Sequence, residues 1–213
     1  MRMQARLSDV VTTSSPLIKR DLEALGISPS SIVVFAGPAP QVQGPRLQRG
    51  TQILWLGSPS TFANIAPLVD RLHRDCPRWH LRIVGAPFDS TQGADGPTFQ
   101  RWTPDVQREA LAMARIGLMP LVRGKWEDRK AAYKVLEYLA EGIVPVVEDV
   151  PALHALLNQD ELDLCVRVIS QDWTAAVQQA WVLPTNDSWI ERRNRLFDRL
   201  SRQRYSRLVL GKS

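Results

Sequence analysis

Short apolar runs rich in β-branched residues alternate with amphipathic segments along most of this chain, and this alternation limits its fold more than any other feature. The runs predict strands over Gln52–Leu56, His80–Val84, Phe99–Trp102, Ile116–Leu121, Ile143–Val147 and Leu164–Val168. Apolar residues recur at helical spacing over Thr61–Arg74, Asp105–Met113, Asp128–Glu141, Pro151–Asn158, Asp172–Val182 and Ser188–Arg202. The chain therefore predicts an α/β fold, a Rossmann-like parallel sheet with helices on both faces, plus C-terminal helices.

The chain divides into four predicted segments. A helix over Pro16–Leu25 and a strand over Ile32–Phe35 lie in residues 1–36, and a Pro- and Gly-rich linker follows over 37–50. The α/β domain covers 51–185, and a basic C-terminal helix and tail cover 186–213. Ligands of such sheets bind at the carboxyl ends of the strands, so the loops after the strands are where a site is expected.

Composition narrows the class of protein. Of 213 residues, 44% are apolar and 23% charged, as in ordinary globular proteins, and no apolar run approaches the roughly 18 residues of a membrane span. Residues 1–9 lack the apolar stretch of a secretory signal. Cys76 and Cys165 have no metal or redox spacing, so we expect two buried thiols in a reducing, cytoplasmic compartment. The histidines are scattered, so no metal site is expected.

The positive charge is concentrated at the C-terminus. The net charge of the chain is +5, and residues 191–213 carry seven arginines and Lys212 against Glu191 and Asp198, a net of +6. One interpretation is a solvated helix face; the other is peripheral contact with the acidic inner face of a membrane. Nucleic acid is not an expected partner, because the basic residues lack the interleaved aromatic rings of a single-strand binder.

A turn between the first strand and helix of the α/β domain, Gly57-Ser58-Pro59-Ser60-Thr61, suits a phosphate. Unpaired N–H groups at a helix start can hold an anion, and glycine lets a ligand approach the backbone closely. Ser60 or Thr61 also suits the helix N-cap, which would explain the turn without a ligand. Neither the G-x-G-x-x-G nor the G-x-x-x-x-G-K-[ST] motif is present, which argues against a dinucleotide enzyme and a P-loop NTPase.

The predicted helix Asp128–Glu141 has an unusual charge order. Lys130, Lys134, Glu137 and Glu141 share the stripe opposite its apolar face, with lysines first and glutamates last. Both signs oppose the helix dipole, and the like-charged pairs four residues apart repel each other. A site explains this order, since lysine neutralises phosphate and a carboxylate accepts hydrogen bonds from sugar hydroxyls; an exposed charged face is the alternative. In the preceding loop, Lys125 adds a cation, and Trp126 either stacks on a sugar or pins the loop.

Several segments resemble the C-terminal domain of family-four glycosyltransferases, which have the GT-B fold. These segments are "LSDVVTTSSPLIKRDLEALGI" (Leu7–Ile27), "ILWLGSPST" (Ile53–Thr61), "LRIVGAP" (Leu81–Pro87), "ARIGLMPL" (Ala114–Leu121), "KAAYKVLEYLAEGIVPVV" (Lys130–Val147), and "DW" (172–173) with "YS" (205–206). The resemblance implies that residues 51–185 form a nucleotide-sugar donor domain. It also implies that residues 1–36 are a remnant of the preceding acceptor domain, or an interdomain segment.

The resemblance also implies roles for single residues. Glu137 matches the second glutamate of the E-x7-E motif, which binds the nucleotide ribose. Lys130 and Lys134 match lysines near the diphosphate, Gly57 and Ser58 match the turn that faces the phosphates, and the stretch Arg101, Trp102 and Thr103 matches the backbone that holds the base. Two departures stand out: Arg129 occupies the place of the first glutamate, and the Arg-x4-Lys pair after the first strand is absent.

The expected function is retaining sugar transfer from a nucleotide diphospho-sugar in polysaccharide biosynthesis. No cofactor or metal is expected. Because the resemblance covers only the donor half, the acceptor domain is expected to be missing, and the chain is either a fragment or one half of a two-chain enzyme whose acceptor domain is a separate chain. The alternative is a non-catalytic nucleotide-sugar-binding protein or subunit with the same fold, an alternative that Arg129 favours. The sequence identifies no catalytic residue.

Overall fold

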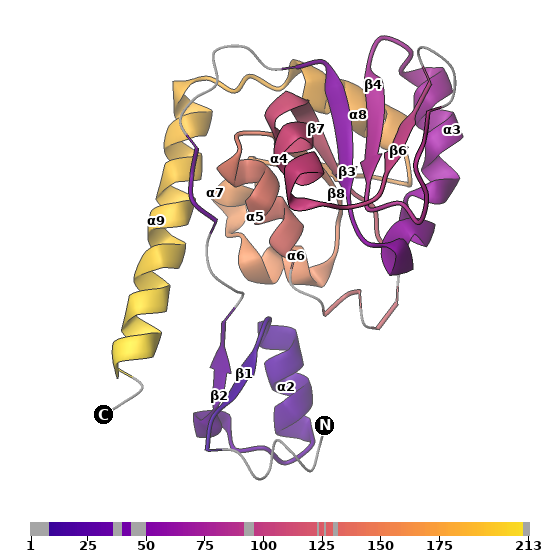
Figure 1. Ribbon diagram of the computed structural model, residues 1–213. Coiled ribbons are helices and arrows are strands. Elements are labelled where there is room, and N and C mark those ends of the chain that lie inside the picture. Colours follow the sequence, from indigo (N-terminus) through magenta and orange to yellow (C-terminus); the bar gives the residue numbers. More distant parts are fainter. Residues whose placement is uncertain are drawn as a thin grey trace.

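A computed structural model of the chain describes residues 9–35, 40–43, 50–91, 96–122, 124–125, 127–129 and 132–210, with side chains up to residue 201 (Figure 1). A seven-stranded sheet with helices on both faces forms the larger part, which confirms the predicted fold class. No helix among these residues is both long and apolar enough to cross a membrane.

The strands of the large sheet lie in the order β5-β6-β4-β3-β7-β8-β9. All neighbouring pairs are parallel except β5 and β6, which are antiparallel. The strands are β3 (Gln52–Leu56), β4 (His80–Val84), β5 (Ser90–Thr91), β6 (Thr98–Gln100), β7 (Ala114–Met119), β8 (Val144–Glu148) and β9 (Val166–Val168). The helices that connect or follow them are η2 (Pro59–Asn64), α3 (Ala66–Asp75), α4 (Pro104–Met113), α5 (Tyr133–Ala140), α6 (Pro151–Leu156), α7 (Gln159–Leu162), α8 (Trp173–Val182) and α9 (Asp187–Leu210).

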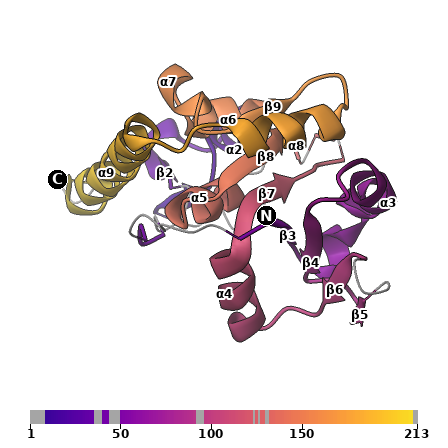
Figure 2. The ribbon, with the colours of Figure 1, turned by 90° about the horizontal axis from the view of Figure 1, so that it is seen from above.

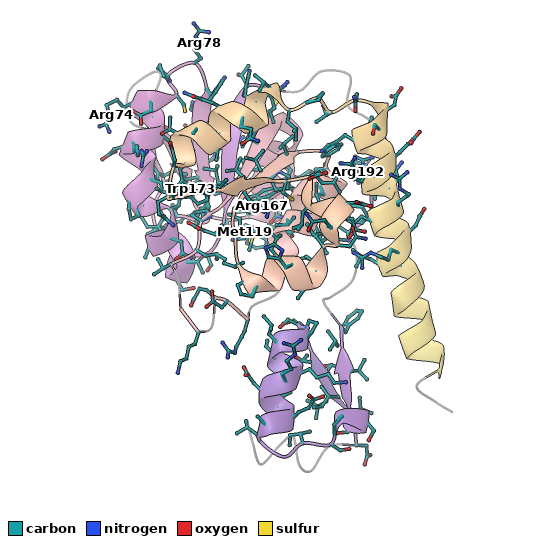
Figure 3. The ribbon with its side chains drawn as sticks, turned by 180° about the vertical axis from the view of Figure 1, so that it is seen from behind. Arg74, Arg78, Met119, Arg167, Trp173 and Arg192 are labelled. Atoms are coloured by element: carbon teal, nitrogen blue, oxygen red, sulfur yellow. The ribbon has the colours of Figure 1, made fainter. Side chains whose placement is uncertain are left out.

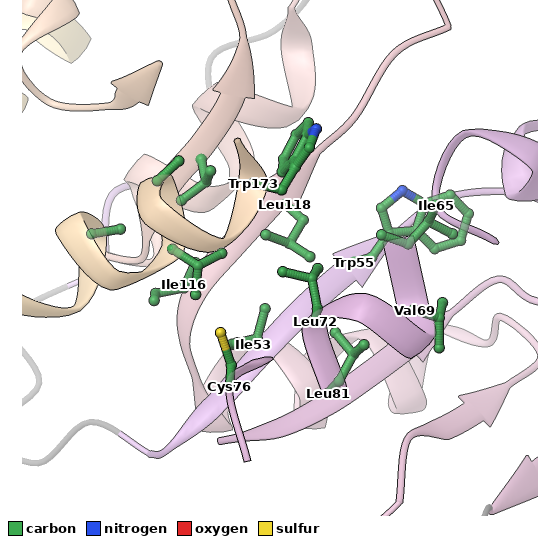
Figure 4. Packing of buried hydrophobic residues seen from close by; sticks show 14 of the residues in the cluster. Ile53, Trp55, Ile65, Val69, Leu72, Cys76, Leu81, Ile116, Leu118 and Trp173 are labelled. Carbon is green, nitrogen blue, oxygen red and sulfur yellow. The ribbon is translucent and has the colours of Figure 1, made fainter. Parts of the chain in front are cut away.

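Alternate residues of the central strand β3 serve two cores on opposite faces of the sheet. Ile53 and Trp55 pack with α3 and α8, where Figure 4 shows them among side chains of neighbouring elements. Leu54 and Leu56 pack on the other face with α4 and with Tyr138 of α5. All four side chains are buried, as a period of two requires of a strand covered on both sides. Figure 2 shows the sheet between these two helix layers.

Residues 11–34 form a small unit of their own, below the large sheet in Figure 1. Strand β1 (Val11–Thr13) pairs in parallel with β2 (Ile32–Val34), and α2 (Pro16–Ala24) and a 3₁₀ turn, η1 (Pro29–Ser31), connect them. Ser15 caps α2, since its hydroxyl accepts from Ile18 N at 3.2 Å. Leu22, Ile27 and Ile32 form the core of this unit.

Arginines in the first half of α9 bind the α/β domain. Arg193 is only 3% exposed, and its guanidinium donates to the Gln43 carbonyl at 3.4 Å. Arg199 donates to the buried Glu161 carboxylate at 2.9 and 2.5 Å, and Arg192 contacts Asp163 at 3.5 Å. Figure 3 shows Arg192 at α9, whereas Arg74 and Arg78 project outward at the opposite end of the domain. Arg192, Arg193 and Arg199 therefore dock α9, whereas the side chain of Arg195 on the same helix is 68% exposed.

Two predicted helices have different bounds in the structure. The segment Thr61–Arg74 is divided into η2 and α3, because Pro67 lacks an N–H and can stand only near a helix start. The helix predicted from Asp128 begins at Tyr133, with Ala132 at its N-cap. Residues 127–129 form turns instead, and the Arg129 carbonyl accepts from the Ser15 hydroxyl at 2.6 Å. Contacts with the N-terminal unit thus override local helix propensity.

Candidate functional site

The strand order reverses its direction between β3 and β7. From β3 the chain proceeds outward through β4 and β6, and from β7 it proceeds outward on the other side through β8 and β9. The loops at the carboxyl ends of β3 and β7 therefore turn away from each other and leave space between them. In open α/β sheets this switch point is where ligands bind.

Tyr138 of α5 bridges the two strands at the switch point. Its hydroxyl accepts from Leu56 N of β3 at 3.1 Å and donates to the Leu118 carbonyl of β7 at 3.2 Å. The ring is fully buried, and burial raises the pKa of its hydroxyl, so the group stays neutral. Gly117 makes room for it, since a Cβ there would lie 2.4 Å from the ring. Tyr138 thereby fixes α5 against the ends of both strands.

The turn after β3 depends on two glycines. A Cβ on Gly57 would lie 2.0 Å from the buried indole ring of Trp55. Gly85 follows β4 with φ of +94°, and a Cβ there would lie 2.2 Å from the Gly57 carbonyl oxygen. Ser58 N donates to the Thr61 hydroxyl at 3.0 Å and so fixes the start of η2. The two loops therefore pack backbone to backbone beside the switch point.

Two adjoining pockets lie at the switch point and share Thr61, Lys134 and Glu137 as a common wall. The first, the apolar pocket, has a volume of about 160 Å³ and is lined by Trp55, Thr61, Asn64, Met119, Pro120, Leu121, Tyr133, Lys134 and Glu137. The second, the polar pocket, has a volume of about 240 Å³ and is lined by Leu56, Gly57, Ser58, Thr61, Trp102, Gln107, Lys134 and Glu137.

A cation and a carboxylate from the first two turns of α5 form the shared wall. The Lys134 ammonium lies 5.3 Å from the centroid of the Trp55 ring, within cation–π range. Burial raises the pKa of Glu137, and the charge of Lys134 opposes that rise. Burial, followed by the charge of Glu137, also raises the pKa of Tyr133. The wall can therefore offer a positive group to an anion and a carboxylate to hydroxyl groups.

Five of the predicted site residues come together here. Gly57, Ser58, Trp102, Lys134 and Glu137 all line the polar pocket, although they come from three separate segments of the chain. The other described candidates line neither pocket. Lys125 is exposed, the Arg101 guanidinium lies 3.6 Å from Asp89, and the Thr103 hydroxyl caps α4 by accepting from Val106 N at 3.2 Å. Trp126 and Lys130 lie outside the described residues.

Sequence reasoning missed several residues that line the pockets. Trp55 was predicted only as part of a strand, and Asn64, Tyr133 and Gln107 were predicted only as parts of helices. Gln107 had one usable signal, because it lies five residues after Trp102 in the first turn of a predicted helix. Among the described residues, no cluster of three or more His, Cys, Asp or Glu side chains could hold a metal ion.

Arg129 binds the N-terminal unit and lines neither pocket. Its guanidinium forms an ion pair with the Asp21 carboxylate of α2, and a second nitrogen lies 3.4 Å from the other oxygen of that carboxylate. Another of its nitrogens donates to the Lys125 carbonyl at 3.0 Å. Asp21 raises the pKa of Arg129, first through the hydrogen bond and then through its charge. This residue therefore links the turn residues 127–129 to α2.

No protein-family model and no curated protein matches the sequence. Solved structures do match the fold. The crystal structure of TarM aligns with all of this chain at a TM-score of 0.64 and 11% identity, over 45% of its own length. The lipopolysaccharide outer core galactosyltransferase WaaB aligns with 97% of this chain at a TM-score of 0.54 and 15% identity, over 63% of its own length.

A third match is the structure of Anabaena HepE in complex with UDP and glucose. It aligns with 97% of this chain at a TM-score of 0.57 and 10% identity, over 62% of its own length. The chain thus spans between 45% and 63% of the length of these three structures. At these identities the likeness establishes the fold, and the resemblance read from the sequence agrees with it: the chain has the Rossmann-like fold of one half of a GT-B glycosyltransferase.

Proposed function

We propose that this chain is the donor-binding domain of a glycosyltransferase and that it binds a nucleotide diphospho-sugar at the switch point between β3 and β7. One observation carries the proposal: Lys134 and Glu137 form the common wall of two pockets that also contain the turn after β3. These residues suit an anion flanked by hydroxyl-bearing rings, which is the chemistry of a sugar nucleotide.

The pockets suggest how the ligand would lie. The base and ribose would occupy the polar pocket, with the ribose hydroxyls donating to Glu137 and the base beside the half-exposed Trp102 ring. The diphosphate would lie between the Lys134 ammonium and the turn at Gly57 and Ser58. In sugar transfer the diphosphate leaves with negative charge, and a lysine already held in place stabilises that charge as it develops. Acceptor binding and retention of configuration belong to the same proposal, with the acceptor held by a further domain or chain.

Calorimetric titration of the full chain with UDP, GDP and ADP tests the proposal. We expect at least one nucleotide to bind and Glu137→Ala to weaken its binding by about 10- to 100-fold, because hydrogen bonds to a charged group contribute about 1.5–3 kcal/mol. Lys134→Ala should weaken binding by about tenfold.

The matched control is Glu191→Gln, which removes a carboxylate of α9 that is 70% exposed and lines neither pocket. Its affinity should equal that of the wild type. Unchanged affinity in Glu137→Ala, with circular dichroism showing a folded protein, would refute the proposed site.

The alternative is a protein that binds nucleotide sugars without catalysis, and the Arg129–Asp21 ion pair favours it. The position that the resemblance assigns to a sugar-binding glutamate carries an arginine whose partner is in α2. Isotope-labelled donor distinguishes the two functions: an enzyme, with its acceptor and acceptor-binding partner supplied, transfers the label, and a binding protein releases the donor unchanged.

A further inference from the structure

The side-chain amide of Gln107 has a fixed orientation in the polar pocket. The Trp102 indole nitrogen donates to Gln107 Oε1 at 2.5 Å. An indole N–H can only donate, so its partner must be the amide oxygen, and this settles which end of the amide carries the nitrogen. In the described part of the chain, no group accepts a hydrogen bond from Gln107 Nε2. The amide therefore has two N–H groups to offer, whereas one of the two lone pairs of its oxygen is already taken by the Trp102 indole.

The backbone around this pair is also well fixed. Thr103 caps α4 with its hydroxyl, and Gln107 N donates to the Thr103 carbonyl at 3.0 Å, which places Gln107 in the first helical turn. Trp102 is 52% exposed, so its ring leaves surface on which a flat ligand can stack. Both residues line the polar pocket, whose shared wall carries Glu137.

We propose that Gln107 selects the nucleobase: its Nε2 donates to a ring carbonyl at the position where cytosine and adenine carry an amino group. The favoured ligands are nucleotides of the oxo bases, uracil and guanine. An amino group at that position would place its N–H groups opposite those of Gln107 Nε2, so that neither donor has an acceptor. Two unpaired donors cost more binding free energy than the loss of one contact. The inference rests on the proposed function, because it assumes that the polar pocket holds the base.

Two matched pairs of nucleotides test it by calorimetry on the full chain, UDP against CDP and IDP against ADP. UDP and CDP differ only in the carbonyl or amino group at the 4 position and the adjoining ring nitrogen. We expect the wild type to prefer the oxo member of at least one pair by about tenfold. Equal affinity within both pairs, or a preference for the amino member, overturns the inference.

Two variants separate base selection from general effects on binding. In Gln107→Glu the carboxylate still accepts from Trp102 but has no N–H, so the preference should shift toward CDP and ADP. Comparison within each pair cancels the repulsion between the new charge and the diphosphate. Trp102→Phe keeps an aromatic ring for stacking but removes the indole N–H. The Gln107 amide can then rotate, and the preference for the oxo nucleotide should fall to about threefold or less. A preference unchanged in both variants refutes the role of Gln107.

The inference and the proposed function can fail separately. If nucleotides bind and Glu137→Ala weakens their binding, but the two members of each pair bind equally, the donor site stands and Gln107 is only a lining residue. If no nucleotide binds the wild type, both fail together.

Discussion

Single residues at the switch point show two features of a binding site: a half-buried carboxylate and glycines that let large rings pack beside it. Glu137 is a carboxylate whose burial raises its pKa, which means that the folded chain resists its ionisation. Gly57 and Gly117 lack side chains where the rings of Trp55 and Tyr138 need the space. The sequence could identify Glu137, Lys134 and Gly57, because charge order and turn chemistry are local. It could not identify Trp55 or Gln107, because their position at the pockets depends on how β3 and α4 lie in the sheet.

Replacing Glu137 should therefore raise the free energy of unfolding of the chain and lower its affinity for the ligand. Because the pKa of Glu137 is raised in the folded state, the folded chain binds more protons than the unfolded chain above the ordinary carboxyl pKa of 4.5. Stability is thus lost as the pH rises from that value through the raised pKa. We expect urea denaturation to show Glu137→Gln to be more stable than the wild type at pH 7, by a margin that shrinks toward pH 4. A variant less stable than the wild type at pH 7 would contradict this account.

The elements show where contacts far apart in the sequence override local signals. The stretch before Tyr133 has helix-favouring residues, yet the Ser15 hydroxyl and the Asp21 carboxylate hold Arg129 in a turn. Helix α9, in contrast, includes the whole segment predicted as helical. Three of its arginines, Arg192, Arg193 and Arg199, dock it through contacts that the local sequence did not indicate. Arg199 binds Glu161, which itself caps α7 by accepting from Asn158 N at 2.9 Å.

Loss of the Arg199–Glu161 pair should loosen α9. Glu161 has a side chain only 6% exposed, so Arg199→Met would leave a buried carboxylate without its cation and the Leu156 carbonyl without its donor. Arg199 itself is 30% exposed, so solvent compensates in part, and we expect a loss of about 2 kcal/mol in urea denaturation. Arg195→Met is the control: that side chain is 68% exposed and its nearest carboxylate oxygen is 3.9 Å away, so the loss should stay below about 0.5 kcal/mol. Equal losses in the two variants would exclude the docking role.

At the scale of the whole molecule, the alternation of strands and helices was sufficient to predict the fold class. Continuous apolar strands such as β8 must be covered on both faces, and this requirement leaves few architectures. The short elements β1, β5 and α7 escaped prediction, whereas the equally short β2, β6 and β9 overlap apolar runs and were predicted. The placement of the N-terminal unit against the turn residues 127–129 also escaped prediction, since nothing local pairs Asp21 with Arg129.

Nucleotide binding should stabilise the molecule as a whole, because the polar pocket joins loops from both sides of the switch point. A nucleotide present at 100 times its dissociation constant contributes about 2.7 kcal/mol to folding, which for a chain of this length raises the melting temperature by about 5–10 °C. Thermal unfolding monitored by fluorescence should show this shift with the nucleotide that binds best. Lys134→Ala should reduce the shift, and an equal shift in that variant would place the nucleotide elsewhere.

The ion pair between Arg129 and Asp21 of the N-terminal unit determines which residues a chimera of the α/β domain must contain. A chimera built from the seven-stranded sheet alone, starting at Gln52, would leave the Arg129 guanidinium without the Asp21 carboxylate and the buried Arg193 without the Gln43 carbonyl. An engineer who wishes to graft this α/β domain onto a foreign partner must therefore include Val11–Val34 and residues 40–43 with it.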